Sequence, residues 1–422
     1  MRSVVFLTVV MMFVPICGEE ETAAKRRQGA ANADHNHIAT SQLTTILPQS
    51  GDKEQPMPTT DVEAIKKKAL DALKKSARYI KKIQNEQGQV GKIPGAGITS
   101  IVALAFANSP IRDDYKAIVD NATAFVMKFL KEDGSINDGQ GHIAYKTSVA
   151  LSLLCNLPEA DKKRYPQQIA AMVEYLIKAQ NWNEIVKEDI NNGGWGYDAR
   201  KKENRSDLSN TSFVLQALHD AGVPKDNPVW RRAVVFLSRC QNNPETNDAK
   251  LEGIKNTNDG GFRYGPALRS NVTVRNPDGT VSYPSYGSMT YAGLLSMIYA
   301  FVTKDDARVQ AAIGWVKRNY TLDENPGMSE KRYGPESKQG LYYYYSTLAK
   351  ALYHYGERYL VDSEGNKHDW GVELIEKLVS LQKEDGSWVN ENDRWFEADP
   401  ALSTSYAIIS LSYAIRALSE LK

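Results

Sequence analysis

The chain has 422 residues, of which 42% are hydrophobic and 24% are charged, a composition typical of a globular protein with a full core. Lys and Arg together number 52 against 51 for Asp and Glu, so the formal net charge is +1. A near-neutral chain lacks the basic stripe by which proteins hold nucleic acids, and we expect no nucleic-acid partner.

The first 18 residues have the pattern of an export signal. Arg2 supplies a positive charge, and an apolar run from Val4 to Val14 follows; this run is too short to span a bilayer as a helix. We expect cleavage near Gly18, with lipid attachment at Cys17 as the alternative. Either outcome predicts an exported protein.

Residues 19–59 are rich in polar residues and have no apolar periodicity, which predicts a disordered tether. Two further cysteines, Cys155 and Cys240, lie in apolar stretches of the remaining chain. Two cysteines do not make a disulfide framework for a domain of this size, so we expect buried, unpaired thiols.

From residue 60 onward the sequence alternates between two half-units. The first reads aromatic, aliphatic, three residues and Gln, with some copies degenerate; its copies begin at Tyr79, Phe125, Tyr175, Phe236, Trp315 and Lys377. The second is a pair of residues, usually hydroxyl-bearing, that opens a helix rich in Ala and Leu; its copies begin at Thr99, Thr147, Thr211, Thr290, Ser346 and Thr404. The strict alternation predicts six helical hairpins in residues 60–422.

The two kinds of helix differ in polarity. First-half helices such as 61–84 carry apolar residues at helical spacing and Lys or Glu elsewhere, so one face meets water. Second-half helices such as 403–418 are apolar nearly all round and require burial on all sides. The sequence therefore predicts an all-α protein, an α/α toroid with six outer and six inner helices. An open solenoid is the alternative, but its last repeat normally carries a polar cap, which helix 403–418 lacks.

The segment Gln382-Lys-Glu-Asp-Gly386-Ser-Trp388 resembles the QW repeat of squalene–hopene and oxidosqualene cyclases. Gln180 with Gly194-Trp195 is a looser version. The resemblance, to the squalene cyclase and prenyltransferase superfamily, covers residues 60–422. It implies a closed toroid in which these Gln and Trp residues tie neighbouring helices together and take no part in chemistry.

The sequence departs from that family at the motif that supplies the catalytic acid. Class II triterpene cyclases protonate their substrate with an Asp-x-Asp-Asp-Thr motif at the start of an inner helix. The matching frame here keeps Asp207 and Thr211 but has Ser209 and Asn210 where the other acids stand. The resemblance thus implies an apolar, isoprenoid-type ligand without the intact acid motif. No counterpart of the prenyltransferase zinc ligands is present, and we expect no metal and no cofactor.

In a closed toroid the N-terminal ends of the inner helices gather at one mouth, where polar and aromatic side chains meet a ligand. The predicted catalytic residues are Asp207, Glu397 and Asp399. The predicted ligand-binding residues are Asn210, Tyr286, Tyr344 and Trp395, and Tyr145, Tyr343 and Tyr345 precede or open inner helices as well. Each residue also suits a structural role, as a helix cap or in the core.

Three functions follow from this arrangement. The first is a cyclase-like toroid that binds an apolar small molecule, with peripheral membrane contact left open. The second is an exported polysaccharide lyase or hydrolase, for which the carboxylates of residues 391–400 are the natural candidates. The third is a repeat scaffold for a protein partner. An aromatic cavity favours the first, facing carboxylates favour the second, and a filled core favours the third.

We expect the mouth and the turns to respond differently to mutation. Replacing Glu397 or Asp399 by Ala should alter ligand binding with little loss of stability. Replacing Gln382 or Trp388 should mainly lower the melting temperature.

Overall fold

The computed structural model describes residues 61–198, 205–267, 273–328 and 334–422. The predicted export signal (1–18), with Cys17, and the predicted tether (19–59) lie outside the described residues. Residues Thr60–Lys422 form one compact unit. Among the residues that the structure describes, no helix combines the length and hydropathy needed to cross a bilayer.

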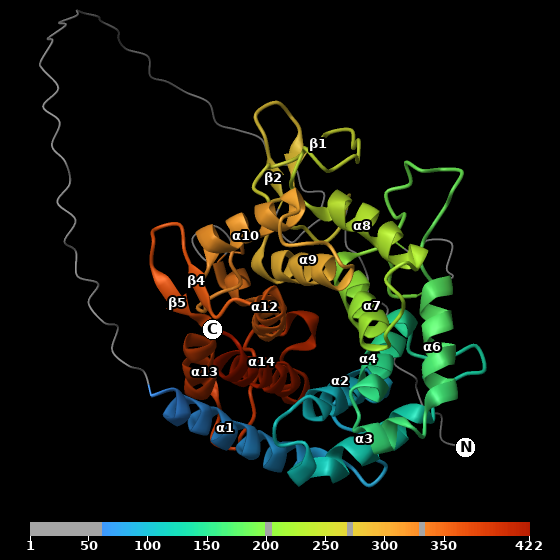
Figure 1. The fold of residues 1–422 in the computed structure, drawn as a ribbon, viewed down its shortest axis with the longest axis vertical. Coiled ribbons are helices and arrows are strands. Elements are labelled where there is room, and N and C mark those ends of the chain that lie inside the picture. Colours follow the sequence, from blue (N-terminus) through green and yellow to red (C-terminus); the bar gives the residue numbers. More distant parts are fainter. Residues whose placement is uncertain (1–60, 199–204, 268–272, 329–333) are drawn as a thin grey trace, which may run out of the picture. The chain divides into compact units, whose positions relative to one another are not determined.

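Within these described ranges, twelve main helices alternate along the chain between an outer and an inner position (Figure 1). The outer helices are α1 (Val62–Ile83), α3 (Lys116–Met127), α6 (Pro166–Lys178), α8 (Pro228–Cys240), α10 (Ala307–Asn319) and α13 (Trp370–Leu381). The inner helices are α2 (Ala96–Ala107), α4 (Ile143–Cys155), α7 (Leu208–Asp220), α9 (Gly287–Tyr299), α12 (Leu341–Tyr355) and α14 (Pro400–Glu420).

Burial separates the two rings as the apolar pattern predicts. Outer helix α1 buries Ile65, Ala69 and Leu73, which recur on one face, while its lysines face water. Inner helix α2 has no charged residue and buries nearly its whole circumference, from Thr99 to Ala107 without a break. The predicted all-α toroid of two concentric rings is confirmed.

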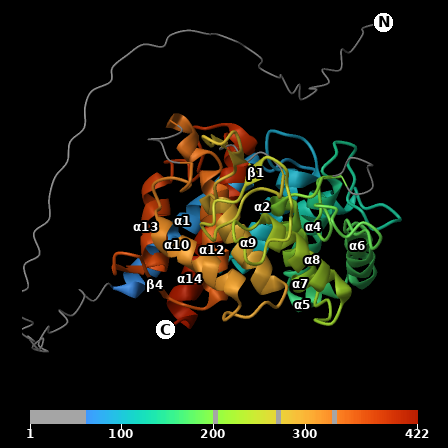
Figure 2. The same cartoon turned by 90° about the horizontal axis from the view of Figure 1, so that it is seen from above.

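The ring closes between the last hairpin and the first. The inner helices contact one another in the order α2, α4, α7, α9, α12 and α14, and α14 contacts α2 again. The outer helices α13 and α1 lie side by side in both views (Figures 1 and 2). Arg416 Nη2 donates a hydrogen bond to the Asn108 carbonyl at 2.7 Å across this seam. The open solenoid is therefore wrong.

A glutamine at the end of four outer helices joins each hairpin to its neighbour. Its Nε2 group donates to the carbonyl of a glycine in the turn that follows and to a carbonyl of another outer helix. The pairs are Gly88 and Ile118 for Gln84 (both 3.1 Å), Gly193 and Val229 for Gln180 (2.9 and 3.0 Å), Gly260 and Arg308 for Gln241 (2.9 and 2.8 Å), and Gly386 and Ala72 for Gln382 (3.0 and 2.9 Å). The bond from Gln382 to Ala72 crosses the seam.

The turn glycines allow the next outer helix to lie directly on the turn. Gly193 has a φ of 92° and Gly386 a φ of 91°, which residues with a side chain rarely adopt. A Cβ atom at Gly193 would lie 1.9 Å from the Arg232 carbonyl oxygen of α8. Side chains larger than hydrogen are excluded at this contact.

Short elements occupy the connections and not the core. They are the helices α5 (Glu159–Lys162), η1 (Asp113–Tyr115), η2 (Gly334–Lys338) and η3 (Arg394–Phe396), and the strands β1 (Ile254–Lys255), β2 (Val274–Arg275), β3 (Val281–Ser282), β4 (Tyr359–Val361) and β5 (Lys367–Asp369). Strand β3 pairs in parallel with β1 and antiparallel with β2, and β4 pairs antiparallel with β5. The β1–β3 sheet belongs to the long connection between α8 and α9.

Gln382→Ala tests the bridging role of the amide. The substitution leaves the Gly386 carbonyl without its donor and removes the second donor of the Ala72 carbonyl, which keeps its bond within α1. A polar group deprived of its partner costs about 1–3 kcal/mol. We expect the free energy of unfolding in urea to fall by that amount. The exposed neighbour Glu384→Ala should change it by less than about 0.5 kcal/mol. Equal effects of the two substitutions would show that the seam is held by other contacts.

Candidate functional site

The inner helices run parallel. Their contacts join N-terminal residues to N-terminal residues and C-terminal residues to C-terminal residues. Near the N-terminal ends, the ring centroids of Tyr343 on α12 and Tyr406 on α14 are 5.6 Å apart. Near the C-terminal ends, those of His354 on α12 and Tyr413 on α14 are 5.7 Å apart. The N-terminal ends of the inner helices therefore face the same mouth of the ring.

Asp207 caps α7 at this mouth. Its Oδ1 atom accepts hydrogen bonds from the Asn210 backbone N–H at 2.9 Å and the Ser209 hydroxyl at 2.7 Å, and Oδ2 accepts one from Asn210 Nδ2 at 2.8 Å. The residue is only 2% exposed. Burial raises the pKa of this carboxyl to about 6, although the donors oppose the shift. Asp207 therefore exchanges its proton close to neutral pH.

Phenol groups surround Asp207, and we call Tyr197, Asp207, Tyr264 and Tyr286 the Asp207 cluster. The hydroxyl groups of Tyr264 and Tyr197 are hydrogen-bonded at 3.3 Å. Burial raises the pKa of all three phenols, and the charge of Asp207 raises it further. The cluster thus joins one weak acid to three neutral phenols.

Two predicted ligand-binding residues belong to this region. Asn210 holds Asp207 through its Nδ2 group, while its buried Oδ1 atom has no hydrogen-bond partner among the described residues. Tyr286 precedes α9 and is 2% exposed. The structure thus places Asp207, Asn210 and Tyr286 in one region, at the starts of α7 and α9.

Glu397 has a structural role at the start of α12. Helix α12 begins after Gly340, which has no side chain to cap it. The Glu397 carboxylate accepts hydrogen bonds from the N–H groups of Tyr342 at 3.1 Å and Tyr343 at 2.8 Å, and so caps α12 from another hairpin. Asn390 Nδ2 donates to it as well, at 2.7 Å. Burial raises the pKa of Glu397 to about 7.

Asp399 is also a structural residue. Its Oδ1 atom accepts a hydrogen bond from the Ala401 N–H at 2.9 Å and caps α14, while Oδ2 accepts one from the Lys92 N–H at 2.8 Å across the seam. The oxygens of both carboxylates are thus engaged by helix ends and loops. Both carboxylates cap helices, so Ala substitutions at Glu397 or Asp399 should lower stability. Their catalytic role stays a prediction.

Tyr344 and Trp395 lie apart from the Asp207 cluster. Tyr344 is fully buried, and its hydroxyl donates to the Thr321 carbonyl at 2.6 Å, so it belongs to the core. Trp395 is 39% exposed with a φ of 56°, and its ring lies so close to Gly340 that a Cβ there would be 2.8 Å away. It forms part of the exposed surface near the start of α12.

Below the Asp207 cluster, four aromatic rings meet around the axis; we call Tyr145, Phe213, Tyr343 and Tyr406 the aromatic collar. Their centroids are 5.0 Å apart for Tyr145 and Phe213, 6.0 Å for Phe213 and Tyr343, and 5.6 Å for Tyr343 and Tyr406. A hydrogen bond with Tyr406 counteracts the rise in the pKa of Tyr145 that burial causes. Inner helices α4, α7, α12 and α14 thus meet through one set of aromatic side chains.

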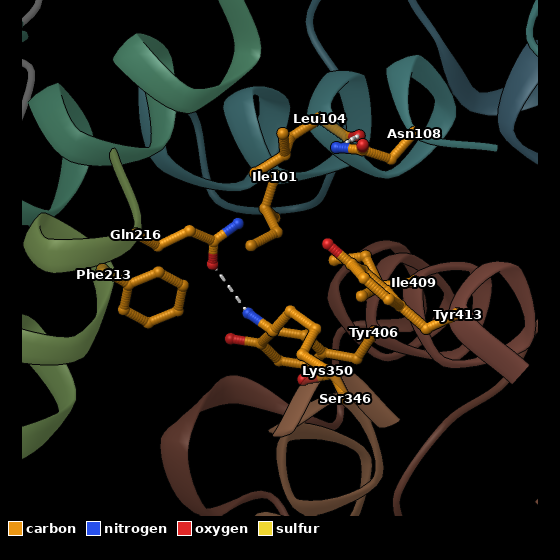
Figure 3. A pocket seen from close by; sticks show the side chains of 10 residues that line it. All are labelled: Ile101, Leu104, Asn108, Phe213, Gln216, Ser346, Lys350, Tyr406, Ile409 and Tyr413. Atoms are coloured by element: carbon orange, nitrogen blue, oxygen red, sulfur yellow. Dashed lines mark hydrogen bonds between the residues drawn. The ribbon is translucent and has the colours of Figure 1, made fainter. Parts of the chain in front are cut away.

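The collar borders a central cavity (Figure 3). Its lining residues are Ile101, Leu104, Asn108, Phe213, Gln216, Ser346, Lys350, Tyr406, Ile409 and Tyr413. The volume of this cavity is only about 10 Å³. That is room for about one water.

Sequence reasoning missed Phe213, Gln216, Lys350 and Tyr406. Lys350 carried a usable signal, because it is a charged residue within the otherwise apolar face of an inner helix. Within the described ranges, no group of three His, Cys, Asp or Glu side chains is close enough to hold a metal ion.

The fold and its axial site define an α/α toroid. Neither a protein family model nor a curated protein sequence matches the chain. Among solved structures, it is similar to an Asp-to-Ala variant of the type II terpene cyclase MstE from Scytonema in complex with the product merosterolic acid A, at 12% identity and a TM-score of 0.53, over 84% of this chain and 99% of that chain.

A variant of the same enzyme in complex with its substrate geranylgeranyl dihydroxybenzoate is similar at 13% identity and a TM-score of 0.52, over 85% of this chain and 99% of that chain. An α-amylase from Clostridium perfringens, at 12% identity and a TM-score of 0.46 over 84% of this chain and 99% of that chain, is too distant to carry an argument. These identities establish a shared fold alone.

The pKa of Asp207 predicts a pH dependence of stability. Its folded value of about 6 lies above the ordinary value of 3.8, so the folded state binds this proton more tightly than the unfolded chain. The contribution is complete below about pH 4 and is lost as the pH rises through 6, a change of about 3 kcal/mol.

Asp207→Asn keeps a capping side chain and removes this titration. Urea unfolding at pH 4 and pH 7 should show that the stability of the wild type relative to the variant falls by about 2 kcal/mol between the two pH values. The other carboxyl groups titrate in the same way in both proteins, so their contributions cancel in the difference between the two free energies of unfolding. A pH-independent difference would mean that Asp207 has an ordinary pKa.

Proposed function

We propose that the toroid binds an apolar, isoprenoid-type ligand along its axis and does not cyclise it by protonation. The observation that carries this proposal is the lining of the axis. From the aromatic collar to Ile101, Leu104 and Ile409, the side chains are mostly aromatic and aliphatic. The polar residues among them are Asn108, Gln216, Ser346 and Lys350. Such a lining suits an apolar chain, and the MstE structures show that this fold holds geranylgeranyl compounds.

The Asp207 cluster argues against class II cyclisation. Protonation of an unactivated alkene needs a much stronger acid than a carboxyl with a pKa of about 6. Ser209 and Asn210 donate hydrogen bonds to Asp207 and supply no second acid. Binding without conversion is therefore the better interpretation of this site.

The carboxylates argue against sugar chemistry. Hydrolysis of a glycosidic bond normally needs two carboxyl groups that face the bond. Glu397 and Asp399, the predicted pair, accept hydrogen bonds from the ends of α12 and α14. Their oxygens are engaged by the scaffold, so the predicted pair does not face a bound sugar.

The narrow cavity favours a repeat scaffold as the second candidate, because a ligand has to displace side chains to enter. The cost is modest. Each contact between two aromatic rings is worth about 0.5–1.5 kcal/mol, whereas burial of each CH₂ group of a ligand gains about 0.8 kcal/mol. A chain of several isoprene units therefore offsets the opening of the collar.

Calorimetric titration with geranylgeraniol and with maltoheptaose separates the three functions. We expect geranylgeraniol to bind with a negative heat-capacity change and to be recovered unchanged by gas chromatography and mass spectrometry. Binding or cleavage of maltoheptaose would favour the sugar enzyme, and recovery of a cyclised isomer would favour a cyclase. If neither compound binds, the scaffold is the better explanation.

Phe213→Trp tests whether the ligand passes the collar. The larger ring fills the space beside Tyr145 and Tyr343, and we expect the affinity for geranylgeraniol to fall at least about tenfold, or 1.4 kcal/mol. Phe129→Trp makes the same change after outer helix α3 and should leave affinity unaltered. An unchanged affinity in both variants would place the ligand elsewhere.

A further inference from the structure

The central cavity contains a buried ammonium group. Lys350 lies on inner helix α12 and is 7% exposed. Its Nζ atom donates a hydrogen bond to Gln216 Oε1 of α7 at 2.9 Å, and it lies 5.7 Å from the centre of the Phe213 ring (Figure 3). Within the described part of the chain, no carboxylate lies within 4.0 Å of it.

The nearest acidic influence is indirect. Asp220 at the end of α7 acts on Lys350 through its charge, and the two residues share Gln216, which accepts from Lys350 and is hydrogen-bonded to Asp220. Asn156 also donates a hydrogen bond to Asp220 Oδ2 at 3.2 Å. Burial lowers the pKa of Lys350 to about 8, so the amine is still mainly protonated at pH 7. A buried ammonium with three N–H donors is costly unless an anion or several acceptors satisfy it.

We propose that the ligand of the central cavity carries a carboxylate at one end, which forms an ion pair with Lys350 while its apolar chain lies against the aliphatic and aromatic lining. This inference rests on the proposed function and names the chemical class of its ligand, an apolar carboxylic acid.

The surroundings of Lys350 favour a carboxylate over larger anions. The Gln216 side chain and the Ser346 hydroxyl line the same space, but Gln216 Oε1 accepts from Lys350 and the Ser346 hydroxyl donates to the Tyr343 carbonyl at 2.9 Å. The ammonium is therefore the group that meets the anion. One ammonium balances the single charge of a carboxylate, whereas a diphosphate brings more negative charge than one lysine neutralises. The cavity has room for about one water, so a small head group displaces fewer side chains than a large one. Ile101, Leu104 and Ile409 suit the chain that follows it.

The test compares geranylgeranoic acid with geranylgeraniol, two ligands that differ in the head group. We expect the wild type at pH 7 to bind the acid at least about tenfold more tightly than the alcohol, since a hydrogen-bonded charge pair exceeds a neutral hydrogen bond by that margin. Equal affinities, or preference for the alcohol, would overturn the inference while leaving the proposed function intact.

Lys350→Met assigns the preference to this residue. The variant retains the length and apolar body of the side chain, and we expect the preference for the acid to disappear while the affinity for the alcohol changes less than about threefold. Lys178→Met, on the exposed face of outer helix α6, should keep the preference. A preference that persists in Lys350→Met overturns the inference. If neither ligand binds the wild type, the proposed function itself fails.

Discussion

A side-chain amide that donates to two backbone carbonyls holds the hairpins of this toroid together. Four glutamines do so in the same way, each joining its own turn to another outer helix. A buried carbonyl without a donor costs more than a typical hydrogen bond gains, so the bridge both satisfies the turn and fixes the position of the neighbouring helix. The contact recurs at four of the six junctions between neighbouring outer helices.

The glutamine hydrogen bonds that join the hairpins lie at the perimeter of the ring. Residues along the axis can therefore differ in type without loss of these bonds. Its N-terminal mouth combines helix caps with a weakly acidic aspartate. Two caps come from one stretch: Glu397 serves α12, and Asp399 serves α14. Below them lies the aromatic collar, and below the collar lies the buried ammonium of Lys350. The side chains along the axis thus change from phenols to packed aromatic rings and then to a charged group.

The sequence predicts the ring well because hairpin repeats with alternating amphipathic and apolar helices have few other ways to bury their surfaces. The sequence also singles out Asp207 and Asn210, because both stand in the segment 207–211 that resembles the acid motif of the cyclases. It does not separate capping from catalysis at Glu397 and Asp399, because that depends on which backbone N–H groups point at them. Phe213 and Lys350 lie on helices that are apolar all round, where periodicity does not indicate the face toward the axis.

The seam has a consequence for how the chain folds. The hydrogen bond from Gln382 to Ala72 joins residues 310 positions apart, whereas that from Gln180 to Val229 spans 49. Loop-closure entropy grows only with the logarithm of length, so the seam costs merely about 2 kcal/mol more than a contact between adjacent hairpins. Its penalty is kinetic: contacts of high sequence separation form slowly. The other hairpins should assemble first as an open arc, and the final step should be the docking of α13 and α14 against α1 and α2.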